Sequence, residues 1–456
     1  MDMAEYGRTT VLANAVAIGS SSVEAVPVGK PAAQMPDTRI LKSDTIRLKM
    51  RAPAGREVES VETDGAGTLD FLPNRPGQPK RFLSGDKFWI AYGAQNRIQT
   101  FRSVNVKTRT ERPPTPKEPM PPVGTTESQE ILATFNPTTS ELDKIEQNKA
   151  FHYQEGERQA RADRATLDQA KDVINLDGSA RVWDPTGLSL ADHIVMNQKT
   201  GDYVAVGHVA STREPDKKGQ SSAMLSNDQV LEARADRMTA ADSHRKIHYE
   251  GNAVAWQGAN RVEADKIDID RQRHVMEAHG KVVSQFVDKS DDDKKDDGKK
   301  KQTPSKNDAK KKDDKPKPTV FTVVRAPDLT YTDETRVALY QGGVSLVRPG
   351  LTVDGKTVRA FLKTSDDDSS LDKAIADGDV KIVSTGVDKR IRTGTADHSE
   401  YYTDDQRVIL QGGSPLLIDS LKGRTAGAQL TWFANNDRLL VNGAESKPTE
   451  SVLKKK

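Results

Sequence analysis

The sequence has no cysteine among its 456 residues, which excludes zinc fingers, thiol enzymes and disulfide-stapled scaffolds. No apolar run approaches the roughly 18 residues that a membrane-spanning helix needs. Residues 1–33 lack the basic start and continuous apolar core of a secretory signal. The chain is therefore either cytosolic or truncated. Because Thr9 to Ile18 resembles the end of a repeat whose first half is missing, we expect a truncated chain with any signal or membrane anchor upstream.

Hydrophobic and aromatic residues are scarce, at 34% and 5% of the chain. Both values are low for a compact globule of this length, so the composition predicts a narrow interior. Charged residues make up 30%, yet their signs nearly cancel to a net charge of +2. Nucleic-acid-binding domains are usually strongly basic, and we therefore expect no nucleic acid partner.

The motifs of common catalytic sites are missing as well. The sequence contains no HExxH, no GxxxxGK[ST] and no GxSxG. Its eight histidines are scattered, and we expect them to face solvent. The acidic run Asp291 to Asp297 lacks the glycine and glutamate spacing of a calcium loop. The sequence predicts no catalytic site, no metal and no cofactor, and hence a protein that is not an enzyme.

What the chain does contain is a repeat, seen most clearly in Arg261 to Gln285, RVEADKIDIDRQRHVMEAHGKVVSQ. Apolar residues alternate with polar ones in this stretch, with Ile267 and Ile269 on one face. Alternation with period two is typical of a half-buried β-strand and not of a helix. A polar corner at Arg271 to Arg273 then leads into a second such run. The stretch predicts two antiparallel strands, which together we call a wind.

The same wind recurs along the whole chain. Each wind has an anchor residue, usually aspartate, followed two and four positions later by small, apolar or aromatic residues. Nine windows keep these two columns, with anchors at Asp44, Asp86, Asp163, Asp192, Asp236, Asp265, Pro327, Asp397 and Ala428. Neighbouring anchors lie 29 residues apart from Asp163 to Asp192 and from Asp236 to Asp265. A period of this length indicates stacked supersecondary units, each unable to bury its own apolar face.

Glycine and aspartate hold fixed places in each wind. Gly178, Gly251, Gly342 and Gly412 fall in phase with the apolar face of the second strand. A glycine inside a strand usually marks a bulge or a close backbone approach. We interpret the anchor aspartate as a corner residue whose carboxylate accepts hydrogen bonds from nearby backbone amides. The wind beginning near Asp354 fits least well, because Thr357 and Arg359 fall in its apolar columns.

Two interruptions divide the repeat into three segments. The proline-rich stretch RPPTPKEPMPP, starting at Arg112, cannot donate into a strand ladder and predicts an extended linker. A second interruption, with 12 lysines and 9 aspartates between Asp288 and Lys317, is too polar to fold and predicts disorder. The expected organisation is a first segment at 38–110, a linker at 111–127, a second segment at 128–287, a disordered insertion at 288–318 and a third segment at 319–447.

The repeated corner A-D-x-x-x-Y/I/M followed by L-x-G-x-V/A-x-V resembles the OstA-like family of periplasmic lipopolysaccharide-transport proteins, which includes LptA, LptC and the amino-terminal part of LptD. The best matches are ARADRATLDQAKDVINLDGSARVWD from Ala160, EARADRMTAADSHRKIHYEGNAVAWQG from Glu232 and GTADHSEYYTDDQRVILQGG from Gly394. The resemblance implies an all-β fold, an elongated twisted β-jellyroll or solenoid. With about ten winds, this chain would hold two or three jellyroll units in tandem.

The resemblance also implies a function. In this family the apolar interior holds the acyl chains of lipopolysaccharide, and units join end to end by strand addition to bridge the periplasm to the outer membrane. We therefore expect a periplasmic glycolipid carrier, with other bridge proteins as partners. Physical reasoning supports this expectation, because an interior of small and medium apolar residues has room for an elongated guest.

The candidate groove-lining residues are the in-phase set of the winds. They are Leu176, Val182, Ile194, Met196, Met238, Tyr249, Ile267, Ile269, Tyr331, Tyr340, Leu346, Tyr401, Leu410 and Trp432. Each of them could equally be packed core without a ligand. Two other functions remain open: a structural or adhesin-like β-solenoid, whose interior would be solid, and a polysaccharide-active β-helix enzyme. The enzyme would need clustered acids on one exposed face, and no acidic column persists through successive winds.

Overall fold

The computed structural model describes the chain apart from residues 7, 28–34, 54, 117, 140, 215–229, 243, 289–319, 364–370, 387–388, 434–437, 444–447 and 454–456. The described residues form 29 strands and one short 3-10 turn, η1 (Ala94–Asn96). Among them, no helix is long and apolar enough to cross a membrane. The chain divides into two compact units. Unit 1 holds residues 1–211 and 239–243, and unit 2 holds residues 212–238 and 244–456.

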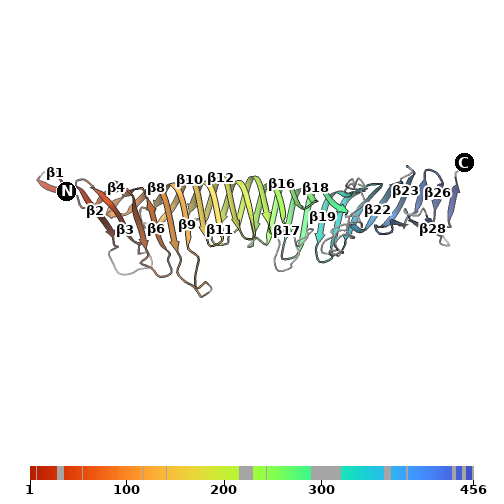
Figure 1. The fold of residues 1–456 in the computed structure, drawn as a ribbon, viewed down its shortest axis with the longest axis horizontal. Coiled ribbons are helices and arrows are strands. Elements are labelled where there is room, and N and C mark those ends of the chain that lie inside the picture. The colour runs from red at the N-terminus through yellow and green to blue at the C-terminus, as the bar shows by residue number, and fades with distance from the viewer. Residues whose placement is uncertain are drawn as a thin grey trace, which may run out of the picture. The chain divides into compact units, whose positions relative to one another are not determined.

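The strands of unit 1 begin near the amino terminus with short and interrupted elements and continue with long ones. In order they are β1 (Asp2–Tyr6), β2 (Thr9–Ala25), β3 (Thr38–Met50), β4 (Val58–Thr63), β5 (Gly67–Leu72), β6 (Lys80–Gly85), β7 (Lys87–Tyr92), β8 (Ile98–Glu111), β9 (Gly124–Phe135), β10 (Leu142–Glu155), β11 (Arg158–Asp168), β12 (Val173–Asp184), β13 (Gly187–Asn197) and β14 (Tyr203–Arg213). Figure 1 shows β8 to β12 following one another as neighbours, and each successive pair is antiparallel.

The strands that lie wholly or mostly in unit 2 show the reverse order, long elements first and short ones at the end. They are β15 (Leu231–Ala241), β16 (Lys246–Gln257), β17 (Asn260–Asp270), β18 (Val275–Asp288), β19 (Val320–Thr332), β20 (Val337–Arg348), β21 (Leu351–Leu362), β22 (Leu371–Thr385), β23 (Ile391–Tyr402), β24 (Arg407–Gln411), β25 (Leu416–Asp419), β26 (Gly423–Ala426), β27 (Gln429–Phe433), β28 (Arg438–Asn442) and β29 (Glu450–Leu453). From β16 to β23, each strand pairs antiparallel with the next one in sequence.

Alternate long strands, such as β16, β18 and β20, bend near the middle at a β-bulge whose two residues lie opposite a single residue of the anchor strand beside it. In β16 the register with β17 shifts between Glu250 and Ala253, and the two residues between them, Gly251 and Asn252, both have positive φ, at 79° and 47°. Two successive left-handed residues insert one extra residue and turn the strand sharply. A glycine is suited to the first of these positions because it has no Cβ to clash. Of the glycines in phase with the apolar face, Gly178, Gly251 and Gly342 are at bulges, and Gly412 lies between β24 and β25.

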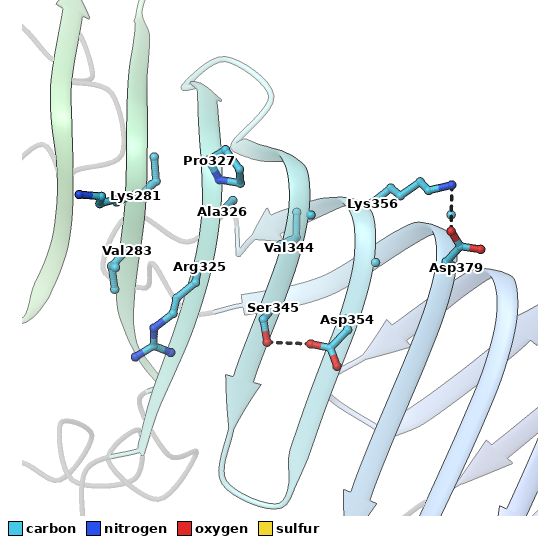
Figure 2. A pocket seen from close by; sticks show the side chains of 14 residues that line it. Lys281, Val283, Arg325, Ala326, Pro327, Val344, Ser345, Asp354, Lys356 and Asp379 are labelled. Carbon is cyan, nitrogen blue, oxygen red and sulfur yellow. Dashed lines mark hydrogen bonds and ion pairs between the residues drawn. The ribbon is translucent and has the colours of Figure 1, made fainter.

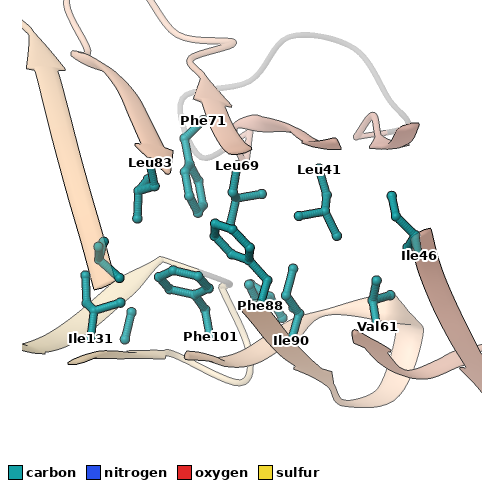
Figure 3. Packing of buried hydrophobic residues seen from close by; sticks show 13 residues of the cluster. Leu41, Ile46, Val61, Leu69, Phe71, Leu83, Phe88, Ile90, Phe101 and Ile131 are labelled. Carbon is teal, nitrogen blue, oxygen red and sulfur yellow. The ribbon is translucent and has the colours of Figure 1, made fainter. Parts of the chain in front are cut away.

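The bend divides the sheet of each unit into two leaves. We call the row of bulges that joins the two leaves the corner. The two leaves are easiest to see beside β3, which is continuous but has a different short partner in each leaf. It pairs with β5 through Thr38 to Ser43 and with β4 through Ile46 to Met50. We call leaf A the side that contains β5 and β6 in unit 1 and β25 and β26 in unit 2. Leaf B is the side that contains β4 and β7 in unit 1 and β24 and β27 in unit 2. Buried residues of both leaves pack together in unit 1, as Leu69 and Phe88 do (Figure 3).

The two columns predicted from the sequence point inward. The residue two positions after each of the nine anchors is buried, from Ile46, which is fully buried, to Ala165 at 6% exposed. The residue four positions after the anchor is buried in six windows, and Leu48, Leu167 and Met196 are half-buried. The all-β jellyroll fold class is confirmed. Burying each apolar side chain of this size contributes roughly 1.5–3 kcal/mol, so these columns supply much of the stability.

One wind has a different register from the one expected. Its anchor is Lys356 and not Asp354, because Val358 and Ala360 are the buried residues of β21, at 0% and 1% exposed. Thr357 is half-buried and Arg359 is exposed. The sequence reading failed because it searched for aspartate, whereas here the charges are exchanged. Lys356 on β21 forms an ion pair of 2.9 Å with Asp379 at the bulge of β22.

The division into three segments stays a prediction. Strands β8 and β9, on either side of the proline-rich stretch, pair directly, with Ser103 opposite Ile131. Likewise β18 and β19 pair with each other across the lysine- and aspartate-rich stretch. Residues 289–319 of that stretch lie outside the described residues.

Candidate functional site

The corner of each unit is built from the anchor of one strand and the glycine of the next. A Cβ added to Gly251 would lie 2.9 Å from Cβ of Asp236, so the aspartate side chain covers the glycine closely. The same arrangement recurs in other winds, where the anchor and the glycine that it covers are fifteen residues apart. The pairs are Asp163 with Gly178, Asp192 with Gly207, Asp236 with Gly251, Asp265 with Gly280 and Pro327 with Gly342.

The corner carboxylates bind mostly side chains, which corrects the expectation of backbone amides. Asn252 donates from Nδ2 to Oδ2 of Asp236 at 3.0 Å, and Nδ1 of His208 lies 2.8 Å from Oδ2 of Asp192. Asp44 does accept a hydrogen bond from a backbone amide, that of Ser20 at 3.4 Å. The bulge explains the difference, because its second residue projects toward the anchor of the neighbouring strand.

The interior is asymmetric, and leaf A carries its smaller side chains. The residue immediately before the anchor points inward and is alanine in six windows, with every side chain at most 8% exposed. These are Ala162, Ala191, Ala235, Ala264, Ala326 and Ala396. The sequence reading noted the Ala-Asp pairs but did not assign the alanines to the interior. The signal available in the sequence was the recurrence of alanine at the position before the anchor.

The larger side chains stand on leaf B, and most of the predicted groove residues are among them. Thirteen of the fourteen are buried, at 8% exposed or less, and Met196 is half-buried. Twelve lie on leaf B, while Val182 and Leu346 lie on leaf A. Cross-strand pairing brings several of them together, including Leu176 with Ile194 and Tyr249 with Ile267. The structure therefore places the set inside the roll, and their contact with a ligand stays a prediction.

Buried hydroxyl groups connect the two leaves at several points. In unit 1, the hydroxyls of Ser189 and Tyr203 lie 2.7 Å apart, and both side chains are buried. In unit 2, Nη1 of Arg348 donates to Oη of Tyr401 at 3.1 Å. Burial raises the pKa of Tyr340, so its hydroxyl stays protonated, with the neighbouring Ser284 hydroxyl acting in the opposite sense. The interior is thus apolar with a few hydroxyl groups that reach across it.

A pocket of about 840 Å³ lies on unit 2 at the corner of β18 to β22. Figure 2 shows Pro327, Ala326 and Val344 at its centre, with Lys356 and Asp379 paired at one side. The pocket forms where the column of aspartates is interrupted: Pro327 takes the anchor place, and a Cβ on Gly343 would meet nothing within 4 Å. None of the predicted groove residues lines this pocket.

Five histidines pair with carboxylates on strands of the sheets. The contacts between Nδ1 and a carboxylate oxygen range from 2.6 Å, for His193 with Asp177, to 2.8 Å, for His279 with Asp328. These side chains are between 28% and 91% exposed, so they face solvent to different degrees, as expected. Within the described ranges, no group of three or more histidine, aspartate or glutamate side chains is arranged to hold a metal ion.

Long antiparallel strands that bend at a mid-strand bulge and enclose an apolar interior define a β-jellyroll repeat protein. The family model described as LptA/(LptD N-terminal domain) LPS transport protein matches residues 78–202, 207–299 and 323–437. Because these matches cover more than half of the sequence, the chain belongs to this family of lipopolysaccharide transport proteins. The resemblance inferred from the corner motif is confirmed.

The comparison with solved structures matches several chains. One of them is the crystal structure of LptH from Pseudomonas aeruginosa, described as the LptA homologous periplasmic component of the lipopolysaccharide transport device. That structure is 19% identical to this chain, with a TM-score of 0.24, and the match covers 27% of this chain and 82% of LptH. The comparison with curated proteins found no match.

Proposed function

We propose that this protein carries the acyl chains of a lipopolysaccharide-type glycolipid between the two leaves of its jellyroll. The single observation that supports the proposal most is the continuity of the inward columns. In unit 2, the position two residues after the anchor is apolar and buried in Met238, Ile267 and Leu329. Family membership gives the ligand class, and the interior gives the place where its apolar part would lie.

The energetics of such an interior suit transport. Each CH₂ group moved from water into an apolar interior contributes roughly 0.8 kcal/mol, so several acyl chains would be held firmly. A row of chemically similar side chains offers similar affinity at each step along the roll. An acyl chain can therefore shift from one wind to the next against small barriers. The role requires no chemistry of the protein, and we propose that it is not an enzyme.

The end strands suit assembly with other bridge proteins by strand addition. Among the described pairings, β1 pairs with β2, β28 with β27 and β29 with β26. An edge strand offers unpaired N–H and C=O groups that another chain can extend as a further strand. We infer that the partners are other jellyroll components of a lipopolysaccharide bridge and that the protein works in the periplasm.

Lipid extraction tests the proposal directly. Protein purified from a lipopolysaccharide-producing host should carry glycolipid that organic extraction and mass spectrometry identify. The delipidated protein should then bind a fluorescent acyl probe. If no lipid co-purifies and no acyl probe binds, the carrier function is wrong and a structural role for the repeat would replace it.

A further inference from the structure

Two buried hydroxyl groups face each other inside unit 2 without a well-formed bond. Tyr340 stands on leaf B, on β20, and Ser284 stands on leaf A, on β18; both side chains are fully buried. Neither Oη of Tyr340 nor Oγ of Ser284 has a hydrogen-bond partner of good geometry in the described part of the chain. A buried hydroxyl left in this state costs about 1–3 kcal/mol, so a pair of them needs a physical reason.

Some buried hydroxyls of the interior have partners, whereas those of Ser103, Thr166 and Ser399 have none among the described residues. Oη of Tyr331 donates to Oδ1 of Asp333 at 3.1 Å in the same unit. In unit 1, the hydroxyls of Ser189 and Tyr203 bond to each other at 2.7 Å. The fold is thus able to satisfy a buried tyrosine, either within one leaf or across the two. Tyr340 and Ser284 differ from a single unsatisfied hydroxyl because the two groups are neighbours. Burial raises the pKa of Tyr340 and Ser284 is close enough to lower it, yet neither hydroxyl makes a hydrogen bond of good geometry with any described residue.

The surroundings of the pair are apolar. Ser284 is paired across the strands with Val324, and Tyr340 with Leu329 and Val358, all of them fully buried. A hydrogen bond formed in such a medium is stronger than one formed in water. A ligand with a single acceptor atom there would bind with its acyl chain against the apolar columns and its acceptor at the two hydroxyls.

We propose that Tyr340 and Ser284 form a binding site for the carbonyl oxygen of an ester or amide that joins an acyl chain to its polar head. A carbonyl oxygen has two lone pairs and can accept one bond from each hydroxyl. The two residues belong to opposite leaves, so the same contact would hold the leaves together around the chain. The inference rests on the proposed carrier function and adds selectivity for carbonyl-linked acyl chains.

A pair of amphiphiles that differ only at the linkage tests the site. A sugar myristate ester and the myristyl ether of the same sugar would compete against a fluorescent acyl probe on the full chain. Two hydrogen bonds of ordinary strength predict that the ester binds about tenfold more tightly than the ether. The double variant Tyr340→Phe with Ser284→Ala should bind both equally, at the affinity that the wild type has for the ether.

A matched control uses the same chemical change on the outer face. Tyr402 is half-buried, and its hydroxyl donates to Glu400 at 2.5 Å. Tyr402→Phe should therefore keep the preference for the ester. The preference itself is measured as a ratio within one protein, so a variant with altered stability still gives a valid reading.

The possible outcomes separate this inference from the carrier function. A lost preference in the double variant, with ether binding retained, supports the site. Equal binding of ester and ether by the wild type overturns the site and leaves the carrier function standing. A preference that persists in the double variant also overturns it. If neither amphiphile displaces the probe, or the probe does not bind, the carrier function fails and the site with it.

Discussion

The phenylalanine-rich cluster of unit 1 and the interior of unit 2 use the same frame and are filled differently. In the cluster, Phe88 and Phe101 stack with ring centroids 5.8 Å apart, and leucine, isoleucine and valine surround them (Figure 3). In unit 2, the equivalent column holds Met238 and Ile267, with alanines opposite and tyrosine hydroxyls between. Both interiors are buried, but the second places alanines opposite its larger side chains and has two neighbouring hydroxyls, those of Tyr340 and Ser284, on opposite leaves.

The repeat therefore fixes where side chains point and leaves their size free. An interior of interlocking rings loses much stability when it opens, because packing contacts are lost all at once. An interior of alanine facing flexible or hydroxylated side chains can exchange its own contacts for those of an acyl chain. We therefore interpret the cluster as a rigid end of unit 1 and unit 2 as a region suited to holding lipid.

The largest expected effect distinguishes these two interiors. Phe88→Ala removes a fully buried ring and should cost about 3–5 kcal/mol of unfolding free energy. Met238→Ala, in the same column of unit 2, should cost about 2–4 kcal/mol. Urea denaturation followed by circular dichroism measures both. An acyl amphiphile should restore part of the loss in Met238→Ala, because it fills the cavity, and none in Phe88→Ala. Equal rescue of the two variants would contradict the comparison.

A second prediction concerns a charged closure at the far end of unit 2. Asp419 is buried and accepts from Nε of Arg390 at 2.9 Å and from the amides of Leu421 and Lys422. Although burial favours its protonated form, these bonds hold the pKa of Asp419 well below its ordinary value of 3.8. Asp419→Asn should cost about 3 kcal/mol at neutral pH, because it leaves a buried arginine without its carboxylate.

The pH dependence of that variant follows from the sign of the shift. A carboxyl whose pKa is lower in the folded state contributes stability above its unfolded pKa and loses it as the pH falls. Wild-type stability should thus decrease as the pH drops below 3.8, and the decrease should be smaller in Asp419→Asn. Parallel curves for the two proteins, measured by urea denaturation across acid pH, would show that the ion pair does not contribute.

The third prediction tests the corner with two glycines. Gly251→Ala has to accept a positive φ of 79° and a contact 2.9 Å from Cβ of Asp236, and should cost about 2 kcal/mol or more. Gly343→Ala has a positive φ of 97° with open space around it, and should cost only about 1 kcal/mol. The difference between the two unfolding free energies isolates the contact with the anchor. If Gly343→Ala proved the costlier change, close packing would not explain the repeated glycine.

The smallest expected effect separates satisfied from unsatisfied tyrosines in unit 2. Tyr331→Phe should cost about 1 kcal/mol, since it removes the bond to Asp333 and leaves that carboxylate with one partner fewer. Tyr340→Phe removes a hydroxyl without a good partner and should be neutral or slightly stabilising, within about 1 kcal/mol. Thermal unfolding of the lipid-free variants measures both, and a larger loss for Tyr340→Phe would mean that its hydroxyl is already satisfied.

Much of the fold could be predicted because its determinants are local in sequence. Alternation along Ile267 and Ile269 predicts a strand with one inward face, and the glycine at position 251 predicts a bulge. Because the same pattern recurs in nine windows, the inward-facing positions of one wind predict those of the other eight. The corner at Lys356 is the exception. There the anchor and its partner exchanged charge, so a search for aspartate missed a corner that the fold preserves.

The candidate site could be predicted only in part, because it depends on contacts between distant residues. The in-phase rule assigned Tyr340 to the interior, but its partner Ser284 lies 56 positions earlier in the sequence, on the opposite leaf. Periodicity gives the face of a residue and not the residue across the interior. The same reasoning explains why the alanine column escaped notice: small residues carry little weight in a hydrophobic pattern.

Whether acyl chains enter the interior can be measured through the tryptophans. Trp432 is 3% exposed inside unit 2, whereas Trp256 is half-buried on the outer face, where Arg234 lies 5.4 Å from its ring. Two variants, each retaining one of these and carrying phenylalanine at the other three tryptophan positions, would be titrated with an amphiphile brominated along its acyl chain. The carrier function predicts strong quenching of Trp432 fluorescence and little quenching of Trp256. Quenching of Trp256 with Trp432 unaffected would place the lipid on the surface and contradict it.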